Sequence, residues 1–284
     1  MTDERTRSAE GHEVLSNTRL SADVHRLLVR APRVAAVRRP GQFVIVRLGP
    51  GAERIPLTIA DADPAEGSIV LVIQAVGKST SDLVALAPGD RIHDVAGPLG
   101  RPSDLVPDGT AVCVAGGVGA AVIFPIARRL ADLGAQVIMV LGARTSDGLL
   151  FEDEFASFAE LVVCTDDGSA GRAGVVTDAL RDLLASRSVD VVYAAGPVPM
   201  MRAVAAATEP VGVRTIVSLN PIMVDGTGMC GGCRVTVDGV MRFACVDGPE
   251  FDAHGVDFDE LSDRLGTYRE FERQAAGHAC RGEG

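Results

Sequence analysis

Three cysteines crowd into sixteen positions near the end of this 284-residue chain, and they constrain its fold more than any other feature. Cys230 and Cys233 form a Cys-x2-Cys pair, and Cys245 follows after eleven intervening residues. Four glycines between positions 226 and 232 allow the backbone to pass close to an inorganic centre. Six cysteines in the whole chain are too few for a disulfide scaffold. The pattern therefore predicts metal chemistry in a reducing compartment.

A β-hairpin is expected to bring the third cysteine to the first two. Asp238-Gly239 is the preferred pair for a two-residue type I′ turn, with short strands expected at 234–237 and 240–244. Pairing across this turn places Cys245 opposite Gly232, beside the Cys-x2-Cys loop. We therefore expect three thiolates to converge.

A fourth ligand can be read from the spacing. Plant-type [2Fe–2S] ferredoxins use Cys-x4-Cys-x2-Cys followed by a distant cysteine, and here Asp225 stands where the first cysteine would be. The sequence thus predicts a [2Fe–2S] cluster on Asp225, Cys230, Cys233 and Cys245. A carboxylate is a harder donor than a thiolate, so it favours ferric iron and a lower reduction potential. A structural zinc with Asp225 or His254 as fourth ligand is the alternative.

The first hundred residues are typical of an antiparallel β-barrel, and we expect this domain to span residues 1–103. Apolar stretches such as Phe43–Leu48 and Ile69–Val76 are rich in Val and Ile and are bounded by turn residues. The first helical stripe comes at Thr80–Leu86.

From Ala111 onward, strand-like and helix-like stretches alternate, which predicts a parallel-sheet α/β nucleotide domain over residues 104–218. The remaining segment, 219–284, is expected to hold the cysteine loop, the hairpin and a C-terminal helix. That helix carries an apolar stripe, for which core packing is favoured over partner docking, and no role is assigned to Cys280. The expected strands are Ala111–Ala115, Val137–Leu141, Leu161–Cys164 and Val189–Ala194; the helices are Ala120–Leu133, Thr177–Ala185 and Pro199–Ala207; the stripe is Phe258, Leu261, Leu265, Tyr268 and Phe271.

Two glycine-containing turns are candidates for binding phosphate groups. Gly116-Gly117-Val118-Gly119 lies between a strand and a helix, where backbone N–H groups can meet a pyrophosphate, although a close strand–helix packing turn explains it as well. Gly77-Lys78-Ser79-Thr80 is similar to the end of a P-loop, but Val72 stands where a Walker A motif requires glycine. ATP binding is therefore rejected, while a diphosphate-binding role stays open.

Composition excludes several classes of partner. Lys and Arg total 27 against 38 for Asp and Glu, and the net charge of −11 is opposite to that of a protein binding nucleic acid or anionic membrane non-specifically. Nine Phe, two Tyr and no Trp cannot build an aromatic platform for single strands. The nineteen uncharged residues 109–127 contain glycines and a proline, so we expect strand, turn and helix rather than a membrane span. With a charged N-terminus, the chain is expected to be cytoplasmic.

Taken together, these segments resemble the ferredoxin–NADP reductase superfamily over nearly the whole chain. The flavin elements are matched by 40–43 (Pro-Gly-Gln-Phe), 54–58 (Arg-x-x-x-Thr) and 77–80, and the nicotinamide elements by 116–119 and 195–197. The cysteine segment resembles iron–sulfur flavoprotein subunits related to the dihydroorotate dehydrogenase electron-transfer subunit. Within these, the chain is most similar to the small (alpha) subunits of sulfide dehydrogenase and NADH-dependent ferredoxin:NADP oxidoreductase. The stretches 53–61, 220–230 and 243–251 carry that choice, because the dihydroorotate branch would have cysteine at Asp225.

The resemblance implies roles for individual residues. Arg54 would bind the flavin diphosphate, with Thr58 near the isoalloxazine, and no residue is assigned as a catalytic acid or base. In place of the family's Ala-Pro and Cys-Gly-Pro, this chain has Ala120-Ala121 and Ala195-Gly-Pro, so cysteine assistance of hydride transfer is absent. The full set implied for FAD is Arg54, Pro56, Leu57, Thr58, Gly77, Ser79 and Thr80, and the set implied for NAD(H) is Gly116, Gly117, Gly119, Gly196 and Pro197.

The expected function follows from the resemblance: electrons pass between NAD(H), FAD and a [2Fe–2S] cluster to a larger partner subunit that carries flavin and [4Fe–4S] clusters. That partner would serve the NADP and ferredoxin side. Arg144 could bind the 2′-phosphate of NADP or be a solvated loop residue, so the sequence does not decide between NAD and NADP. NAD is preferred by resemblance alone. One alternative is an electron-transfer subunit for another dehydrogenase, such as dihydroorotate dehydrogenase. Another is a non-redox nucleotide-binding regulatory module with a structural zinc.

Overall fold

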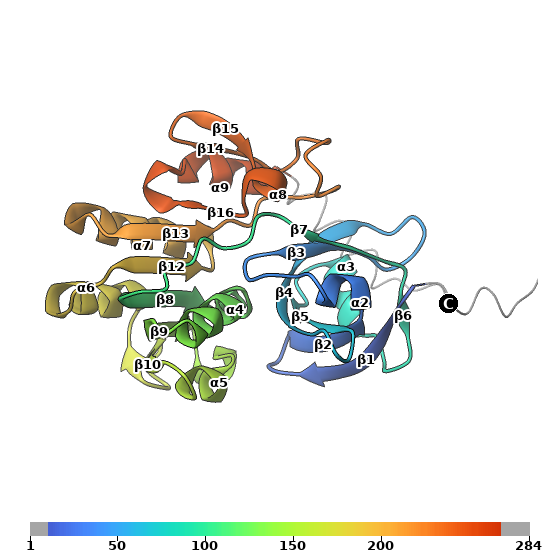
Figure 1. Cartoon of the computed structure of the whole chain (residues 1–284), viewed down its shortest axis with the longest axis horizontal. Helices are drawn as coiled ribbons and strands as arrows, with labels where there is room; N and C mark the ends of the chain where they lie inside the picture. The colour runs from blue at the N-terminus through green and yellow to red at the C-terminus, as the bar shows by residue number, and fades with distance from the viewer. Residues whose placement is uncertain (1–10, 268–284) are drawn as a thin grey trace, which may run out of the picture.

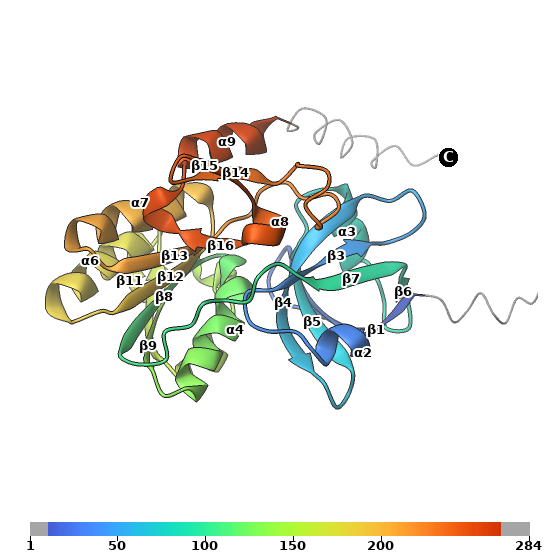
Figure 2. The ribbon, with the colours of Figure 1, turned by 45° about the horizontal axis from the view of Figure 1, so that its top comes forward.

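The computed structural model describes residues 11–267 and contains two seven-stranded sheets and a separate two-stranded hairpin (Figure 1). The C-terminal segment lies over the junction between the two sheets (Figures 1 and 2). This is the fold class predicted from the sequence. Tyr268, Phe271 and Cys280 lie outside the described residues.

The N-terminal sheet is antiparallel and curls into a nearly closed barrel in the order β6-β1-β2-β5-β4-β3-β7. Alternate side chains turn inward, and Val, Ile and Leu fill the interior. The predicted helical stripe lies in α3 (Lys78–Val84), whereas the single turn α2 (Pro32–Ala35) was not predicted. The strands are β1 (His12–Arg19), β2 (Val24–Arg30), β3 (Phe43–Arg47), β4 (Arg54–Asp63), β5 (Ser68–Gln74), β6 (Arg91–Ile92) and β7 (Asp94–Leu99).

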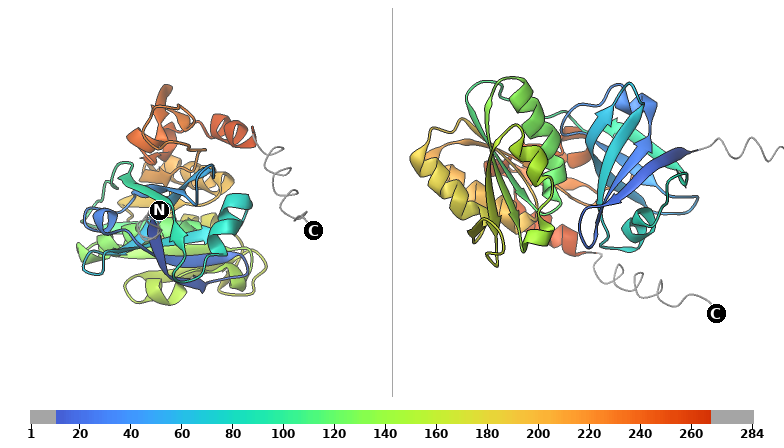
Figure 3. Two further views of the ribbon diagram at one scale, coloured as in Figure 1. Left: turned by 90° about the vertical axis from the view of Figure 1, so that its right-hand side faces the viewer. Right: turned by 90° about the horizontal axis from the view of Figure 1, so that it is seen from below.

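The second sheet has the order β11-β10-β9-β8-β12-β13-β16, and all its pairings are parallel except the last. Helices cover both faces (Figure 3), which confirms the predicted alternation of strand and helix. Its elements are β8 (Thr110–Gly116), α4 (Gly119–Asp132), β9 (Gln136–Ala143), α5 (Glu152–Ala156), β10 (Glu160–Thr165), β11 (Arg172–Ala173), α6 (Val176–Ser186), β12 (Val191–Ala195), α7 (Val198–Thr208) and β13 (Arg214–Ser218).

The uncharged run 109–127 forms β8, the glycine turn and the first part of α4, as expected. Within residues 11–267, no helix is long and apolar enough to cross a membrane. Side chains of β8 alternate between two cores: Val112 and Val114 belong to one, and Cys113 to the other. A strand buried on both faces needs a continuous apolar sequence, which explains the run.

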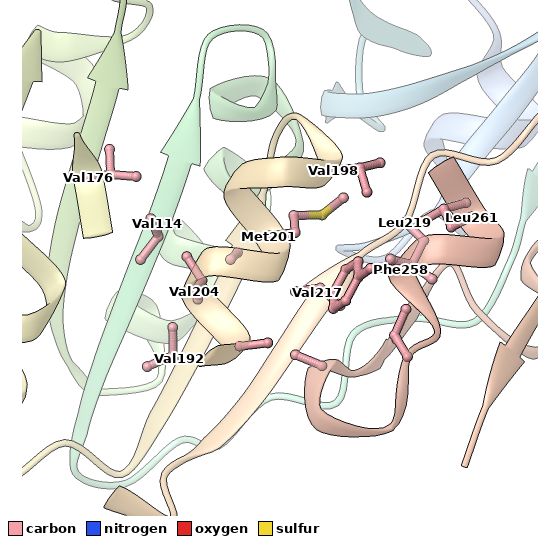
Figure 4. Packing of buried hydrophobic residues seen from close by; sticks show 14 of the residues in the cluster. Val114, Val176, Val192, Val198, Met201, Val204, Val217, Leu219, Phe258 and Leu261 are labelled. Carbon is pink, nitrogen blue, oxygen red and sulfur yellow. The ribbon is translucent and has the colours of Figure 1, made fainter. Parts of the chain in front are cut away.

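The C-terminal segment adds to the first of these cores. On α9 (Phe258–Gly266), Phe258 and Leu261 are buried and Leu265 packs beside them, which confirms core packing for the described part of the predicted stripe. Figure 4 shows Leu261 and Phe258 near Val217 and Leu219, on the side of the sheet that α7 covers. The strand β16 (Glu250–Asp252) pairs antiparallel with β13, so the segment also completes the nucleotide-domain sheet.

The predicted hairpin is present. β14 (Arg234–Val237) pairs with β15 (Val240–Phe243), and Asp238 and Gly239 both have positive φ, as a type I′ turn requires. The predicted pairing of Cys245 with Gly232 is wrong, because the chain leaves the strand after Phe243 and forms the helical turn α8 (Ala244–Asp247). The Asp247 carboxylate accepts the Phe243 N–H (2.9 Å) and stabilises this turn.

Candidate functional site

A cleft of about 980 Å³ opens at the carboxyl ends of the parallel strands. The turn 116–119 after β8 and residues 195–197 after β12 line it, as expected for a nucleotide site in an α/β sheet. The barrel closes the other side with Ser21 and Asp23 between β1 and β2, with Val24 at the start of β2, and with Gln74 at the end of β5. The cleft therefore lies between the two domains.

The glycine turn of this cleft is fixed by close packing. Gly117 has φ of +54° and donates its N–H to the Gly142 carbonyl of β9 (2.9 Å). At Gly119 a Cβ atom would lie 2.2 Å from the Ala195 carbonyl oxygen, so α4 could not begin so close to β12 with any other residue there. The glycines thus serve strand–helix packing, and the same packing leaves their backbone at the edge of the cleft.

Other cleft residues were missed in the sequence analysis. Thr145, two residues after β9, Asp166, directly after β10, and Ser218, the last residue of β13, all line the cleft. Arg144, which was named from the sequence, lines it too. The signal was available, since each of the missed residues lies at or within two residues of the carboxyl end of a parallel strand, and ligands bind at these ends. The barrel residues at 21–24 carried no such signal, because only the domain arrangement brings them there.

The residues expected to bind the flavin lie along β4. Thr58, Pro56 and Arg54 pair with Phe43, Ile45 and Arg47 of β3, and alternation puts these side chains on the outer face of the barrel. Leu57 instead packs against the barrel interior, so only its backbone is available on that face. Arg54 also lines a small hollow of about 240 Å³ with Arg47 and Asp94.

The Gly77–Thr80 segment lies beside the start of β4. Gly77 precedes α3, and the Thr80 Oγ1 atom accepts the N–H groups of Val76 (3.1 Å) and Gly77 (3.0 Å). The Ser79 hydroxyl donates to the carboxylate of Glu53, the residue before Arg54. The structure therefore brings together the two segments that were expected to share the flavin.

Two of the three clustered thiols meet. The sulfur atoms of Cys233 and Cys245 lie 3.2 Å apart, both buried, and the Cys245 N–H also points to the Cys233 sulfur (3.4 Å). Burial and the neighbouring thiol raise the pKa of Cys245 to about 12, so the Cys245 thiol is protonated at neutral pH unless a cation binds it. Sulfurs on one tetrahedral metal ion are about 3.8 Å apart, so a small outward movement would fit an ion between them.

Asp225 and Cys230 are held differently. The Asp225 carboxylate accepts the backbone N–H groups of Thr227 (2.8 Å) and Cys230 (2.7 Å), and these bonds lower its pKa. The Cys230 thiol is exposed. In residues 11–267, no three Cys, His, Asp or Glu side chains are grouped at metal-binding distance, so the expected convergence of three thiolates is formed only in part. The donor groups nevertheless suit iron, because one ionised carboxylate and three thiols lie on two short segments, the loop 225–233 and the turn that holds Cys245.

His254 is not part of this group. It lies in η3 (Ala253–Gly255), and its Nε2 atom is 2.9 Å from the Thr208 hydroxyl of α7. Thr208 in turn accepts a hydrogen bond from Thr215 (2.7 Å). The structure therefore does not support a zinc site with His254 as its fourth ligand.

A buried carboxyl group links the C-terminal segment to the crossing between the barrel and the nucleotide domain. Glu250 of β16 accepts a hydrogen bond from Ser103, in the crossing between the domains (2.7 Å), and its other oxygen has no partner among the described residues. Burial, reinforced by the charge of Asp104, raises the pKa of Glu250 to about 7. The buried Tyr193 hydroxyl donates to the Asp104 carbonyl (2.7 Å) and fixes the same crossing.

Comparisons with known proteins agree with this arrangement. Residues 113–206 match the oxidoreductase NAD-binding domain, and residues 220–257 match the iron–sulfur cluster binding domain of dihydroorotate dehydrogenase B. A homologue of the dihydroorotate dehydrogenase B electron transfer subunit from Thermotoga maritima is 49% identical, over 92% of this chain and 93% of that protein. The chain belongs to this family of electron-transfer subunits. It is an oxidoreductase subunit with an NAD-binding and an iron–sulfur domain.

Solved structures extend the comparison. A chain from a structure described as giving "insights into flavin-based electron bifurcation via the NADH-dependent reduced ferredoxin-NADP oxidoreductase structure" has a TM-score of 0.91 and 46% identity, and covers 99% of this chain and 100% of its own length. A ferredoxin reductase in carbazole 1,9a-dioxygenase has a TM-score of 0.60 at 22% identity, over 72% of this chain and 66% of its own, and shows the fold alone. The predicted resemblance to the ferredoxin–NADP reductase superfamily is confirmed.

Proposed function

We propose that this chain carries electrons between NAD(H) in the interdomain cleft, FAD on the outer face of β4 and a [2Fe–2S] cluster on Asp225, Cys230, Cys233 and Cys245. The proposal is supported mainly by the contacts that the barrel makes with the nucleotide cleft and with the cysteine loop. The cleft reaches the barrel through Ser21, Asp23 and Gln74, and the cysteine loop rests on the barrel strand β3 beside β4. The predicted domain boundaries at 103/104 and 218/219 belong to this proposal.

The chain's own residues bind and position. Arg54, with Ser79 and Thr80 nearby, offers a cation and hydrogen-bonding groups to a diphosphate, and the 116–119 and 196–197 turns leave room for a dinucleotide backbone. Ala195 supplies no side chain that could take part in proton or hydride transfer. When bound, the flavin converts the hydride of NADH into single electrons that the cluster can accept.

The exposed surface at the cluster supports a partner subunit. Met229 is 88% exposed, and Val224 and Val246, which flank the glycines of the loop, are 47% and 43% exposed. An apolar rim around the exposed Cys230 fits a protein surface that shields the electron path from water. We infer a larger subunit with its own redox centres, on the NADP and ferredoxin side. Full NADPH:ferredoxin activity of this polypeptide in isolation would contradict this.

The choice of partner rests on two observations. Asp225 replaces the cysteine expected in the dihydroorotate branch, and the 46% identical structure is titled for a ferredoxin-NADP oxidoreductase. The second candidate is electron transfer to a dihydroorotate dehydrogenase. It is supported by relatives called electron transfer subunits of dihydroorotate dehydrogenase B, such as that of Geobacillus thermodenitrificans (36% identical over 84% of this chain and 95% of that protein). The cytoplasmic location stays a prediction.

An anaerobic visible spectrum of the purified chain, with iron and flavin counted, tests the proposal. We expect flavin and iron–sulfur bands that bleach when NADH is added. A colourless zinc protein that cannot be reconstituted would instead support the regulatory-module alternative.

Asp225→Cys tests the ligand assignment in the same measurement. The variant is expected to keep its iron while the reduction potential of the cluster rises, because a thiolate replaces the harder carboxylate. An unchanged spectrum and potential would show that Asp225 is not a ligand.

A further inference from the structure

Gly226 brings the cysteine loop into close contact with the outer face of the barrel. A Cβ atom at this position would lie 2.7 Å from Cγ1 of Ile45 on β3 and 2.7 Å from Cδ1 of Leu99 on β7. Real Cβ atoms do not come so close to other carbon atoms, so a larger residue at position 226 would have to displace the Ile45 and Leu99 side chains or move the loop. The φ angle of +74° gives a second, independent reason for glycine.

The barrel residues under Gly226 lie next to the expected flavin strand. Ile45 is directly opposite Pro56 in the β3–β4 pair, and their side chains share the outer face. Neighbouring strands are about 4.8 Å apart. The loop that begins with Asp225 therefore rests one strand away from the residues proposed to bind FAD.

The contact at Gly226 and the buried thiols share one packed core. Ile45, Cys233 and Cys245 belong to one buried apolar cluster, and Met223, just before the loop, belongs to it too. A close-packed core transmits a displacement instead of absorbing it. A side chain at position 226 would thus move the loop, including Asp225, relative to the barrel.

We propose that Gly226 is a positioning residue that sets the separation between the flavin and the iron–sulfur cluster, and through it the rate at which electrons pass between them. This inference rests on the proposed function. The step that it governs moves one electron from reduced flavin to one ferric ion of the cluster, which becomes ferrous. NADH supplies the electrons as a hydride, and no covalent bond is made or broken in the governed step.

The test is stopped-flow reduction of the cofactor-loaded chain by NADH, with flavin bleaching and cluster reduction followed separately and the cluster signal confirmed by electron paramagnetic resonance. Gly226→Ala is expected to leave the rate of flavin bleaching within twofold of wild type and to slow cluster reduction at least tenfold, with full iron content. Gly67→Ala is the matched control. Gly67 also has positive φ (+65°), but it lies outside the cysteine loop, and its Cβ would meet the Pro32 side chain (2.9 Å) rather than the residues under that loop. We expect cluster reduction in this control to stay within threefold of wild type.

Further variants approach the contact from the barrel side. Ile45→Phe, which keeps the glycine, should also slow cluster reduction, and it replaces Gly226→Ala if that variant fails to fold. Adding Gly226→Ala to an Ile45→Ala/Leu99→Ala protein should have little further effect, because the colliding atoms are gone. Equal rates in the Gly226 and Gly67 variants, or unchanged cluster reduction in Gly226→Ala and Ile45→Phe, would overturn the inference. Absence of flavin or cluster from the wild-type chain would instead contradict the proposed function itself.

Discussion

The turn 116–119 and the loop 225–233 are both glycine-containing segments proposed to bind a cofactor, but they are held in place by different means. The turn is fixed by the sheet: Gly117 bonds to β9, and Gly119 packs on the backbone of β12. The loop is held by one of the proposed iron ligands, because the Asp225 carboxylate accepts N–H groups from within the loop. Cys230 is exposed, and its sulfur accepts the Gly232 N–H of the same loop (3.4 Å).

The difference separates a pre-formed site from one that its ligand completes. A dinucleotide entering the cleft meets backbone that is already arranged by strand and helix packing, so little conformational entropy is lost. If the proposed ligands are correct, iron binding draws Cys230 and Asp225 toward the buried Cys233–Cys245 pair, and the binding free energy then orders the loop. Metal binding and local folding are therefore coupled in the loop and not in the cleft.

The largest expected effect comes from removing a buried ligand. Cys245→Ala takes away one thiol of the Cys233–Cys245 pair, and we expect iron content to fall to a tenth of wild type or less in a direct metal assay. Cys113→Ala is the matched control, since Cys113 is a buried thiol on β8 outside the loop. Full iron content in Cys245→Ala would remove Cys245 from the ligand set, whereas loss of iron in the control would point to general unfolding.

The cleft should respond to overpacking rather than to loss of a ligand. Gly119→Ala places a Cβ 2.2 Å from a carbonyl oxygen of β12, and since two backbones must separate, we expect a loss of about 3 kcal/mol in unfolding free energy. NADH affinity should fall with it, while iron content stays normal. Gly49→Ala, where nothing lies within 4 Å of the new Cβ, should change stability by less than about 0.5 kcal/mol. Chemical denaturation and NADH titration measure both, and equal stability of the two variants would show that the turn is not fixed by packing.

Glu250, which is hydrogen-bonded to the crossing between the domains, gives an effect that depends on pH. Burial raises its pKa to about 7, so the folded state holds the proton more tightly than the unfolded state. The stabilisation by the protonated group is complete below about pH 4.5 and is lost as pH rises to about 7, with an upper bound of about 3 kcal/mol. Glu250→Gln, which mimics the protonated form, should flatten this part of the stability profile and leave the variant more stable than wild type at pH 8.

The control for this prediction is Glu209→Gln, which changes an exposed carboxylate on η2 (Glu209–Val211) and should leave the profile unchanged. Denaturation curves at pH 5, 6, 7 and 8 provide the measurement. If Glu250→Gln loses stability in parallel with wild type between pH 5 and 7, the carboxyl of Glu250 does not titrate in this range in the folded protein.

The sequence correctly predicted those features of the fold that depend on residues close together in the chain. Asp238-Gly239 determined the turn type and the register of the hairpin, and the apolar run 109–127 was correctly divided into strand and helix. Contacts between distant segments carried no local signal. The helical turn that holds Cys245, the pairing of β16 with β13 and the barrel residues in the cleft depend on how the three parts pack. The buried position of Glu250 belongs to the same group, since its sequence context does not distinguish it from a surface carboxylate.

Hydrogen exchange of the chain with and without its iron tests the contrast most directly, with residues 116–119 and 225–233 followed in the same sample. Removal of iron by a chelator is predicted to raise exchange in the loop by at least tenfold and to leave the glycine turn within twofold of its original rate. Equal changes in the two segments, or a loop whose protection is unaffected by iron, would contradict the view that the cleft is pre-formed and the cluster site is completed by its metal.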